Sequence, residues 1–174
     1  LEPRPLALPG RSVKVLTVGC GSYHTMAVTT SGAVFSWGLN NHGQCGLGNV
    51  VSPVESPALV INLQGVGVVQ VCGGEHHSAA RTEAGDVFVW GRGDSGQIGN
   101  DKEYLEPTHT PICVDALSGK VTSISTGANH TLAVCGHNAL YAWGYGGMCQ
   151  LGNGDDGGDE LTPFRVDRGN RLIL

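Results

Sequence analysis

Hydrophobic residues occur in short runs of four to seven positions, and glycine, asparagine, serine and proline separate these runs. Residues 13–19 (VKVLTVG), 25–28 (TMAV) and 33–38 (AVFSWG) show the pattern clearly. Such runs predict β-strands, and no segment carries the period of an amphipathic helix. A weaker fourth strand is predicted after Pro57, since proline favours a sheet edge. We therefore expect an all-β fold of short antiparallel strands.

The strand pattern repeats every 53 residues. In the turn between the second and third predicted strands, the equivalent residues are Gly32, Gly85 and Asn138. Asparagine readily accepts positive φ among non-glycine residues, so this exchange predicts a left-handed turn position. The same step relates three tryptophans and three histidines: Trp37, Trp90 and Trp143, and His24, His77 and His130.

Four short strands in about fifty residues are typical of a β-propeller blade. We place the units at about residues 13–65, 66–118 and 119–168. Propellers close with roughly four to eight blades. We therefore expect the chain to be part of a longer ring, with residues 3–10 (PRPLALPG) as the tail of a preceding blade.

The units CGSYHTMAVTTSGAVFSWGLNNHGQCGLG and CGGEHHSAARTEAGDVFVWGRGDSGQIG resemble repeats of the regulator of chromosome condensation family. The shared pattern is G-x-x-H, a turn glycine, [FY]-x-W-G and G-Q-x-G. The resemblance covers about residues 13–168 and implies about three blades of a seven-bladed propeller.

The segments GGEHHS and WGYGGMCQLGNGDDGGDE are similar to later blades of family members that exchange guanine nucleotides on the small GTPase Ran. Their order fits the fifth and sixth blades and most of the seventh. The resemblance implies a guanine-nucleotide releasing factor without covalent chemistry or a cofactor. It also implies a nuclear protein of nucleocytoplasmic transport and the cell cycle, which contacts histones or chromatin through regions outside this segment.

His76 breaks the internal symmetry, because its equivalents are Tyr23 and Asn129. Neighbouring strand residues face opposite ways, so we expect these three side chains to emerge from equivalent loops on one rim. The alternative is that His76 is an exposed surface imidazole without a binding role. The repeated histidines are expected instead to satisfy backbone groups within their own blades.

The resemblance implies that His76 contributes to nucleotide exchange on Ran, and Asn41 also occupies a family contact position. Where the family carries a further histidine, this chain has Gly43, with His42 adjacent. The candidate GTPase-binding residues are His76, Asn41, Tyr23, Asn129, Glu75 and His42.

Other functions remain open at this point. Family repeats also serve as interaction scaffolds that exchange no nucleotide, for example in ubiquitin ligases. Metal binding by Cys20 with His24, or by Cys72 with His76, is not favoured, because no fourth ligand is evident. The tripeptide Arg92–Asp94 (RGD) is interpreted as an accidental match to an adhesion signal.

Composition narrows these options further. The net charge is −5 without a cluster of Lys or Arg, which argues against phosphate-mediated nucleic-acid binding by this segment. No apolar run approaches the roughly 20 residues that span a membrane. The six cysteines form no C-x-x-C pair, and Cys20 and Cys45 align with small or apolar residues of other units. We expect all six to be reduced, buried thiols of a nuclear or cytosolic protein.

Overall fold

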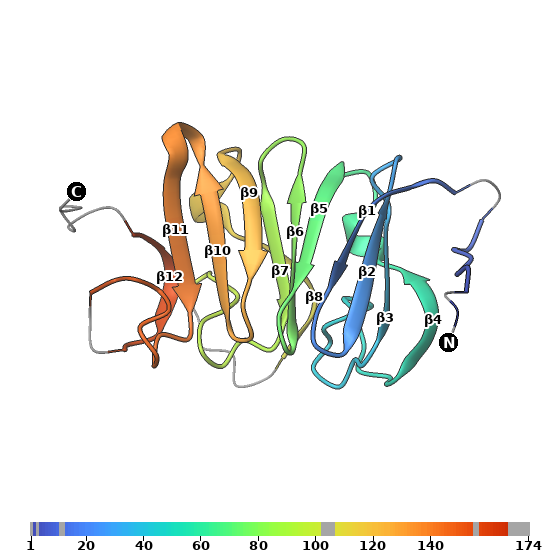
Figure 1. The fold of residues 1–174 in the computed structure, drawn as a ribbon, viewed down its shortest axis with the longest axis horizontal. Coiled ribbons are helices and arrows are strands. Elements are labelled where there is room, and N and C mark those ends of the chain that lie inside the picture. Colours follow the sequence, from blue (N-terminus) through green and yellow to red (C-terminus); the bar gives the residue numbers. More distant parts are fainter. Residues whose placement is uncertain (1, 3, 11–12, 102–106, 155–156, 167–174) are drawn as a thin grey trace.

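The structure is a computed structural model that describes residues 1–174 except 1, 3, 11–12, 102–106, 155–156 and 167–174. Three four-stranded antiparallel sheets lie side by side (Figure 1). The first contains β1 (Val15–Cys20), β2 (His24–Thr29), β3 (Val34–Gly38) and β4 (Val54–Leu59). The second contains β5 (Val68–Gly73), β6 (His77–Thr82), β7 (Val87–Gly91) and β8 (Thr108–Cys113). The third contains β9 (Val121–Thr126), β10 (His130–Cys135), β11 (Ala139–Gly144) and β12 (Glu160–Arg165).

Each sheet has its strands in chain order, so each is one up-and-down propeller blade. The first strands of consecutive blades lie next to one another. β5 packs against β1 and β2, and β9 packs against β5 and β6. The all-β propeller prediction is confirmed. In the described residues, the helical elements are three short 3-10 turns between strands: η1 (Ile61–Leu63), η2 (Asp115–Leu117) and η3 (Gly136–Asn138). Among the described residues, no helix has the length and apolar character needed to span a membrane.

The hydrophobic core lies between blades rather than within them. One cluster joins Met26 and Val28 of the first blade to Val71 and Trp90 of the second. The equivalent cluster joins the second and third blades. Burial of a side chain of this size contributes roughly 1.5–3 kcal/mol. A single blade therefore buries little without its neighbour.

A hydrogen-bonded clasp accompanies this packing. The carbonyl of Gln44 in the first blade accepts from Trp90 Nε1 at 2.8 Å and from Ser78 Oγ at 2.7 Å, both in the second blade. Since the single hydroxyl proton of Ser78 is used in this way, the 2.7 Å contact between Ser78 Oγ and His24 Nε2 requires an N–H donated by His24. Hydrogen bonds therefore run in both directions between the two blades.

The clasp recurs between the second and third blades. The Gln97 carbonyl accepts from Trp143 Nε1 at 3.0 Å and from Thr131 Oγ1 at 3.3 Å, and His77 Nε2 lies 3.1 Å from Thr131 Oγ1. The prediction that the repeated histidines bond backbone groups of their own blades is therefore wrong for His24 and His77. Their rings reach a hydroxyl of the next blade.

The predicted start of the fourth strand is also wrong. β4 begins at Val54, three residues before Pro57. Its pairing with β3 is interrupted between the Gly38–Val54 and Ser36–Ala58 pairs, and Pro57 lies in this irregularity. An edge strand tolerates the missing amide there. The turn position adopts positive φ in all three blades, with 78° at Gly32, 89° at Gly85 and 58° at Asn138.

The cysteines differ in part from the expected buried thiols. Cys45 and Cys135 are buried, whereas Cys20 and Cys149 are exposed. Cys20 lies on β1, in the first blade, which has no preceding blade packed against it among the described residues. Its equivalent on β5, Gly73, packs so closely on the preceding blade that a Cβ atom would lie 2.6 Å from Gly21 N. Cys20 has no such neighbour among the described residues, so the first blade leaves it open to solvent.

Candidate functional site

Four loops meet at one end of the first two blades. They are the β1–β2, β3–β4, β5–β6 and β7–β8 connections, which lie at the lower edge of Figure 1. Antiparallel order within each sheet puts alternate connections at the same end. We name the side chains gathered there the loop cluster, which consists of Tyr23, Asn41, His42, Glu75, His76, Arg92 and Asp94.

A backbone contact fixes the symmetry-breaking position in every blade. The carbonyl oxygens of Tyr23, His76 and Asn129 accept hydrogen bonds from the amides of the residues that follow the W-G motif, at 2.8, 2.9 and 2.8 Å respectively. The glycine of that motif is required in the second blade. Gly91 has a φ of 100°, and a Cβ atom there would lie 2.4 Å from the His76 carbonyl oxygen. The chain thus holds the loop of His76 directly against β7.

His76 lies within a column of three rings. Its imidazole stacks on Tyr23, with centroids 6.1 Å apart and an interplanar angle of 24°. The His42 ring lies on it at 4.6 Å with a tilt of 45°. The Tyr23 residue is 61% exposed, whereas the His76 side chain is 16% exposed. The expectation that His76 emerges from the rim like Tyr23 is therefore wrong in this respect, because Tyr23 and His42 cover it.

The polar atoms of His76 have few partners. Its Nε2 lies 3.7 Å from Glu75 Oε1, which is an ion-pair distance if the imidazole is protonated. Its Nδ1 is buried and has no hydrogen-bond partner among the described residues. A buried polar atom without a partner costs stability, roughly 1–3 kcal/mol, and native proteins retain few of them. The imidazole is therefore held by ring packing more than by hydrogen bonds.

Asn41 and Asp94 occupy equivalent places in the first and second blades and have equivalent contacts. Gln44 Nε2 donates to Asn41 Oδ1 at 3.3 Å, and Gln97 Nε2 donates to Asp94 Oδ1 at 3.5 Å. In both blades the Oε1 atom of the same glutamine accepts a backbone N–H of the loop, at 2.9 and 2.8 Å. The repeated glutamine therefore anchors the side chain that each loop presents.

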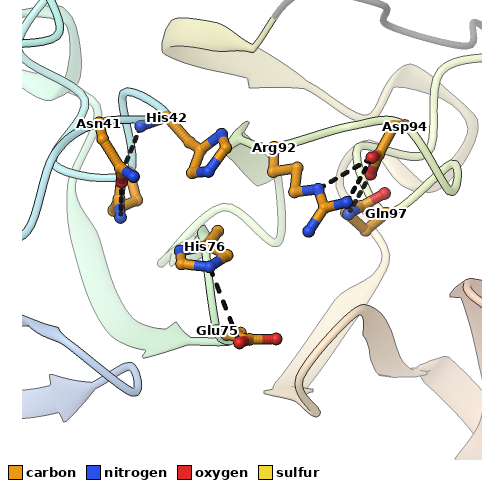
Figure 2. Close-up of polar contacts among 8 residues, drawn as sticks. Asn41, His42, Glu75, His76, Arg92, Asp94 and Gln97 are labelled. Carbon is orange, nitrogen blue, oxygen red and sulfur yellow. Dashed lines mark hydrogen bonds and ion pairs between the residues drawn. The ribbon is translucent and has the colours of Figure 1, made fainter.

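Arg92 and Asp94 are not among the site residues that the sequence predicts, because their tripeptide resembles an accidental match to an adhesion signal. The structure puts them beside the histidines (Figure 2). Arg92 Nε and Nη2 both donate to Asp94 Oδ2, at 2.9 and 2.6 Å. The available sequence signal was positional, because Asp94 stands 53 residues after Asn41.

The electrostatics of the cluster follow from this packing. Burial lowers the pKa of His42, and the nearby His76 and Arg92 lower it further, while Asp94 acts in the opposite direction. Burial acts to raise the pKa of Asp94, but its hydrogen bond and charge interaction with Arg92 leave that pKa below its ordinary value. Burial and the nearby charges of His76 and Arg92 therefore favour an uncharged His42 near neutral pH, and the ionised Asp94 opposes them only in part.

Not every candidate residue reaches the cluster. Asn129 lies at the equivalent place of the third blade, where it is half-buried. Among the described residues it has no ring contact or side-chain hydrogen bond with Tyr23 or His76. The part of the chain that the structure describes also contains no group of three or more His, Cys, Asp and Glu side chains arranged to hold a metal ion.

Comparisons with known proteins match this architecture. The profile of the RCC1-like domain matches residues 1–174. Protein pim1 of Schizosaccharomyces pombe is 35% identical over 185 residues, which covers 95% of this chain and 33% of pim1. The human probable E3 ubiquitin-protein ligase HERC4 is 35% identical over 155 residues, which covers 88% of this chain and 14% of HERC4. The chain therefore spans about a third of pim1 and a smaller part of HERC4.

Two solved structures are similar over most of the chain. Prp20p of Saccharomyces cerevisiae has a TM-score of 0.82 at 26% identity, covering 89% of this chain and 39% of Prp20p. Human WBSCR16 has a TM-score of 0.82 at 31% identity, covering 94% of this chain and 43% of that protein. Both similarities extend across the three blades described above.

Proposed function

Because the chain belongs to the RCC1-like domain family, we propose that it forms part of a guanine-nucleotide exchange factor for the small GTPase Ran. The observation that carries the proposal is the loop cluster. The residues that break the 53-residue symmetry at equivalent loops, Tyr23 and His76, stack on one another and on His42 at one end of two blades. Loops held by a rigid scaffold are the usual place for binding residues.

The comparisons support a small GTPase as the partner. Pim1 covers nearly the whole chain at 35% identity, and the Prp20p structure was described with its binding to Gsp1p and histones. A further structure has Kap60 bound to yeast RCC1 (Prp20). By analogy, the GTPase is the expected partner of the loop cluster, and a nuclear protein with histone contacts through regions outside this chain is the expected setting.

An exchange factor needs no covalent chemistry. It binds the GTPase more tightly when nucleotide is absent, and linkage then requires the bound factor to weaken nucleotide binding by the same ratio. A propeller face suits this work because it remains rigid while it buries the roughly 1,200–2,000 Å² of a specific interface. In this scheme His76, Asn41, His42, Tyr23 and Glu75 contact the GTPase.

The test is nucleotide release. The full-length protein should accelerate release of fluorescent GDP from Ran, and His76→Ala should slow that release while thermal unfolding shows that the variant is still folded. The isolated 174-residue chain should release nucleotide poorly, since it supplies only part of the face. Fast release with His76→Ala, or by the isolated chain, would contradict this assignment.

A second candidate is a scaffold that binds proteins without exchange, since HERC4 matches the chain at the same 35% identity. A pull-down with nucleotide-free Ran separates the two. Retention of Ran that GDP and GTP reverse supports the exchange factor. Absence of retention supports the scaffold.

A further inference from the structure

Tyr23 presents an open aromatic face beside the loop cluster. Its ring is stacked on His76 from one side. The residue nevertheless remains 61% exposed, so the opposite face of the phenol is open to solvent. The underlying loop is fixed, because Ser22 N donates to the Gly74 carbonyl at 3.0 Å and Leu39 N donates to the Tyr23 carbonyl at 2.8 Å. The ring is therefore a rigid platform.

Glu75 places a carboxylate beside His76, the same residue on which the Tyr23 ring stacks. It precedes His76 in the same loop, its side chain is 39% exposed, and its Oε1 atom lies 3.7 Å from His76 Nε2. Glu75 N donates to the Ala128 carbonyl at 2.9 Å, which ties this loop to the third blade. No lysine or arginine of the described residues pairs with this carboxylate. Within the described part of the chain, no positive side chain therefore compensates its negative charge.

The charged pair of the loop cluster does not alter this balance. Arg92 is paired with Asp94 through two hydrogen bonds, so that pair adds no net charge. Lys14 and Lys120 precede β1 and β9 and so lie at the opposite end of the sheets. The described part of the cluster carries one unmatched negative charge next to one open aromatic face.

We propose that Tyr23 and Glu75 form a receptor for one basic side chain of the protein partner, with a guanidinium stacked on the phenol and paired with the carboxylate. Arginine combines these two contacts well, since its planar cation stacks on aromatic faces and its fork of N–H groups matches a carboxylate. His76 is the positioning residue, because it supports the ring from beneath and lies next to the carboxylate. This inference rests on the proposed function only for the identity of the partner.

The experiment uses a probe that does not depend on Ran. N-acetyl-arginine amide is titrated into the ¹⁵N-labelled protein, with N-acetyl-citrulline amide as the uncharged isostere. We expect saturable shifts at the amides of residues 22–24 and 74–77 with the arginine probe, and none with citrulline. Equal shifts with both probes, or no shifts with either, would overturn the receptor.

Variants test each half of the receptor. Glu75→Gln should weaken the arginine probe by roughly two- to fivefold, the range of an exposed ion pair. Tyr23→Leu should weaken it by a similar factor, through loss of the cation–π contact. Glu83→Gln is the matched control, because Glu83 is exposed in the turn between β6 and β7 at the opposite end of the same blade. Equal weakening by Glu83→Gln and Glu75→Gln would mean that overall charge, not the receptor, attracts the probe.

The two proposals fail separately. Nucleotide-free Ran is measured against the same variants. If the arginine probe binds at Tyr23 and Glu75 but Ran does not bind at all, the receptor stands and the exchange function is wrong. If Ran binds and neither Glu75→Gln nor Tyr23→Leu weakens it, the receptor is wrong as a partner contact and the exchange function stands.

Discussion

His24 Nε2 lies 2.7 Å from Ser78 Oγ, so the repeated histidine of one blade donates its proton to a hydroxyl of the next blade. The same hydroxyl donates to the Gln44 carbonyl, to which Trp90 also donates. All of these groups are buried. The G-x-x-H, W-G and G-Q-x-G elements of the repeat therefore act together at one place, as the hydrogen-bonded clasp between blades.

Removal of the Ser78 hydroxyl should lower the free energy of unfolding, because it breaks this clasp. In Ser78→Ala the buried His24 N–H has no acceptor, which costs roughly 1–3 kcal/mol of unfolding free energy. Ser78→Thr is the matched control, since the third blade has Thr131 at the equivalent position, where it contacts the equivalent groups His77 Nε2 and the Gln97 carbonyl. Urea unfolding gives both values. Equal stability of the alanine and threonine variants would show that the hydroxyl of the clasp contributes nothing to the free energy of unfolding.

The buried histidines should make folding sensitive to acid. Burial, with a smaller effect of nearby His76, lowers the pKa of His24 from 6.5 to about 4. Burial, with His24 and His130, lowers the pKa of His77 to about 3. The unfolded chain therefore binds more protons below pH 6.5, so stability is complete above this value and is lost as pH falls toward 4 and then 3. His24 alone accounts for about 3 kcal/mol.

This loss is measured as the free energy of unfolding in urea between pH 7.5 and 4.5. His24→Gln keeps an N–H donor but does not titrate, so the variant should show a shallower decline than the wild type. The same decline in both proteins would mean that other groups cause the acid sensitivity.

The glycine that follows Trp90 should be indispensable for the site. In Gly91→Ala the new Cβ atom would lie 2.4 Å from the His76 carbonyl oxygen, so the loop under the ring column must move. Gly65→Ala is the matched control, since Gly65 also has positive φ, 77°, but nothing lies within 4 Å of its Cβ position. The control should lose about 1–2 kcal/mol, the cost of the left-handed conformation alone. Gly91→Ala should lose clearly more in the same unfolding experiment. Equal losses would contradict the close contact.

Much of the fold could be predicted because the signal was local and repeated. The short runs of apolar residues between turn residues predict the strands, and the 53-residue step predicts the blades. The exchange of Gly32 and Gly85 for Asn138 identifies a turn whose φ is positive in the structure. Each of these inferences depends on neighbouring residues or on a comparison between equivalent ones.

The contacts that were missed depend on the next blade or the next loop. The ring of His24 meets Ser78, a residue 54 positions away, and no local pattern specifies that direction. The covering of His76 depends on Tyr23 and His42, which come from two other loops. Arg92 belongs to the cluster because Asp94 holds it, and that pair is visible only in three dimensions.

The pair of Arg92 and Asp94 should move the pKa of His42 in opposite directions when each member is removed. Asp94 raises this pKa and Arg92 lowers it, against the larger lowering by burial. Asp94→Asn should therefore lower the pKa of His42 further, and it should keep the fold of the loop because Asn41 serves the same position in the first blade. Arg92→Gln should raise the pKa of His42 toward the ordinary value. The pKa of His42 in each variant is measured by NMR, from the pH dependence of the chemical shifts of its ring protons, and is compared with that of the wild type. Shifts of the same sign in the two variants would show that a change of packing, rather than charge, governs this imidazole.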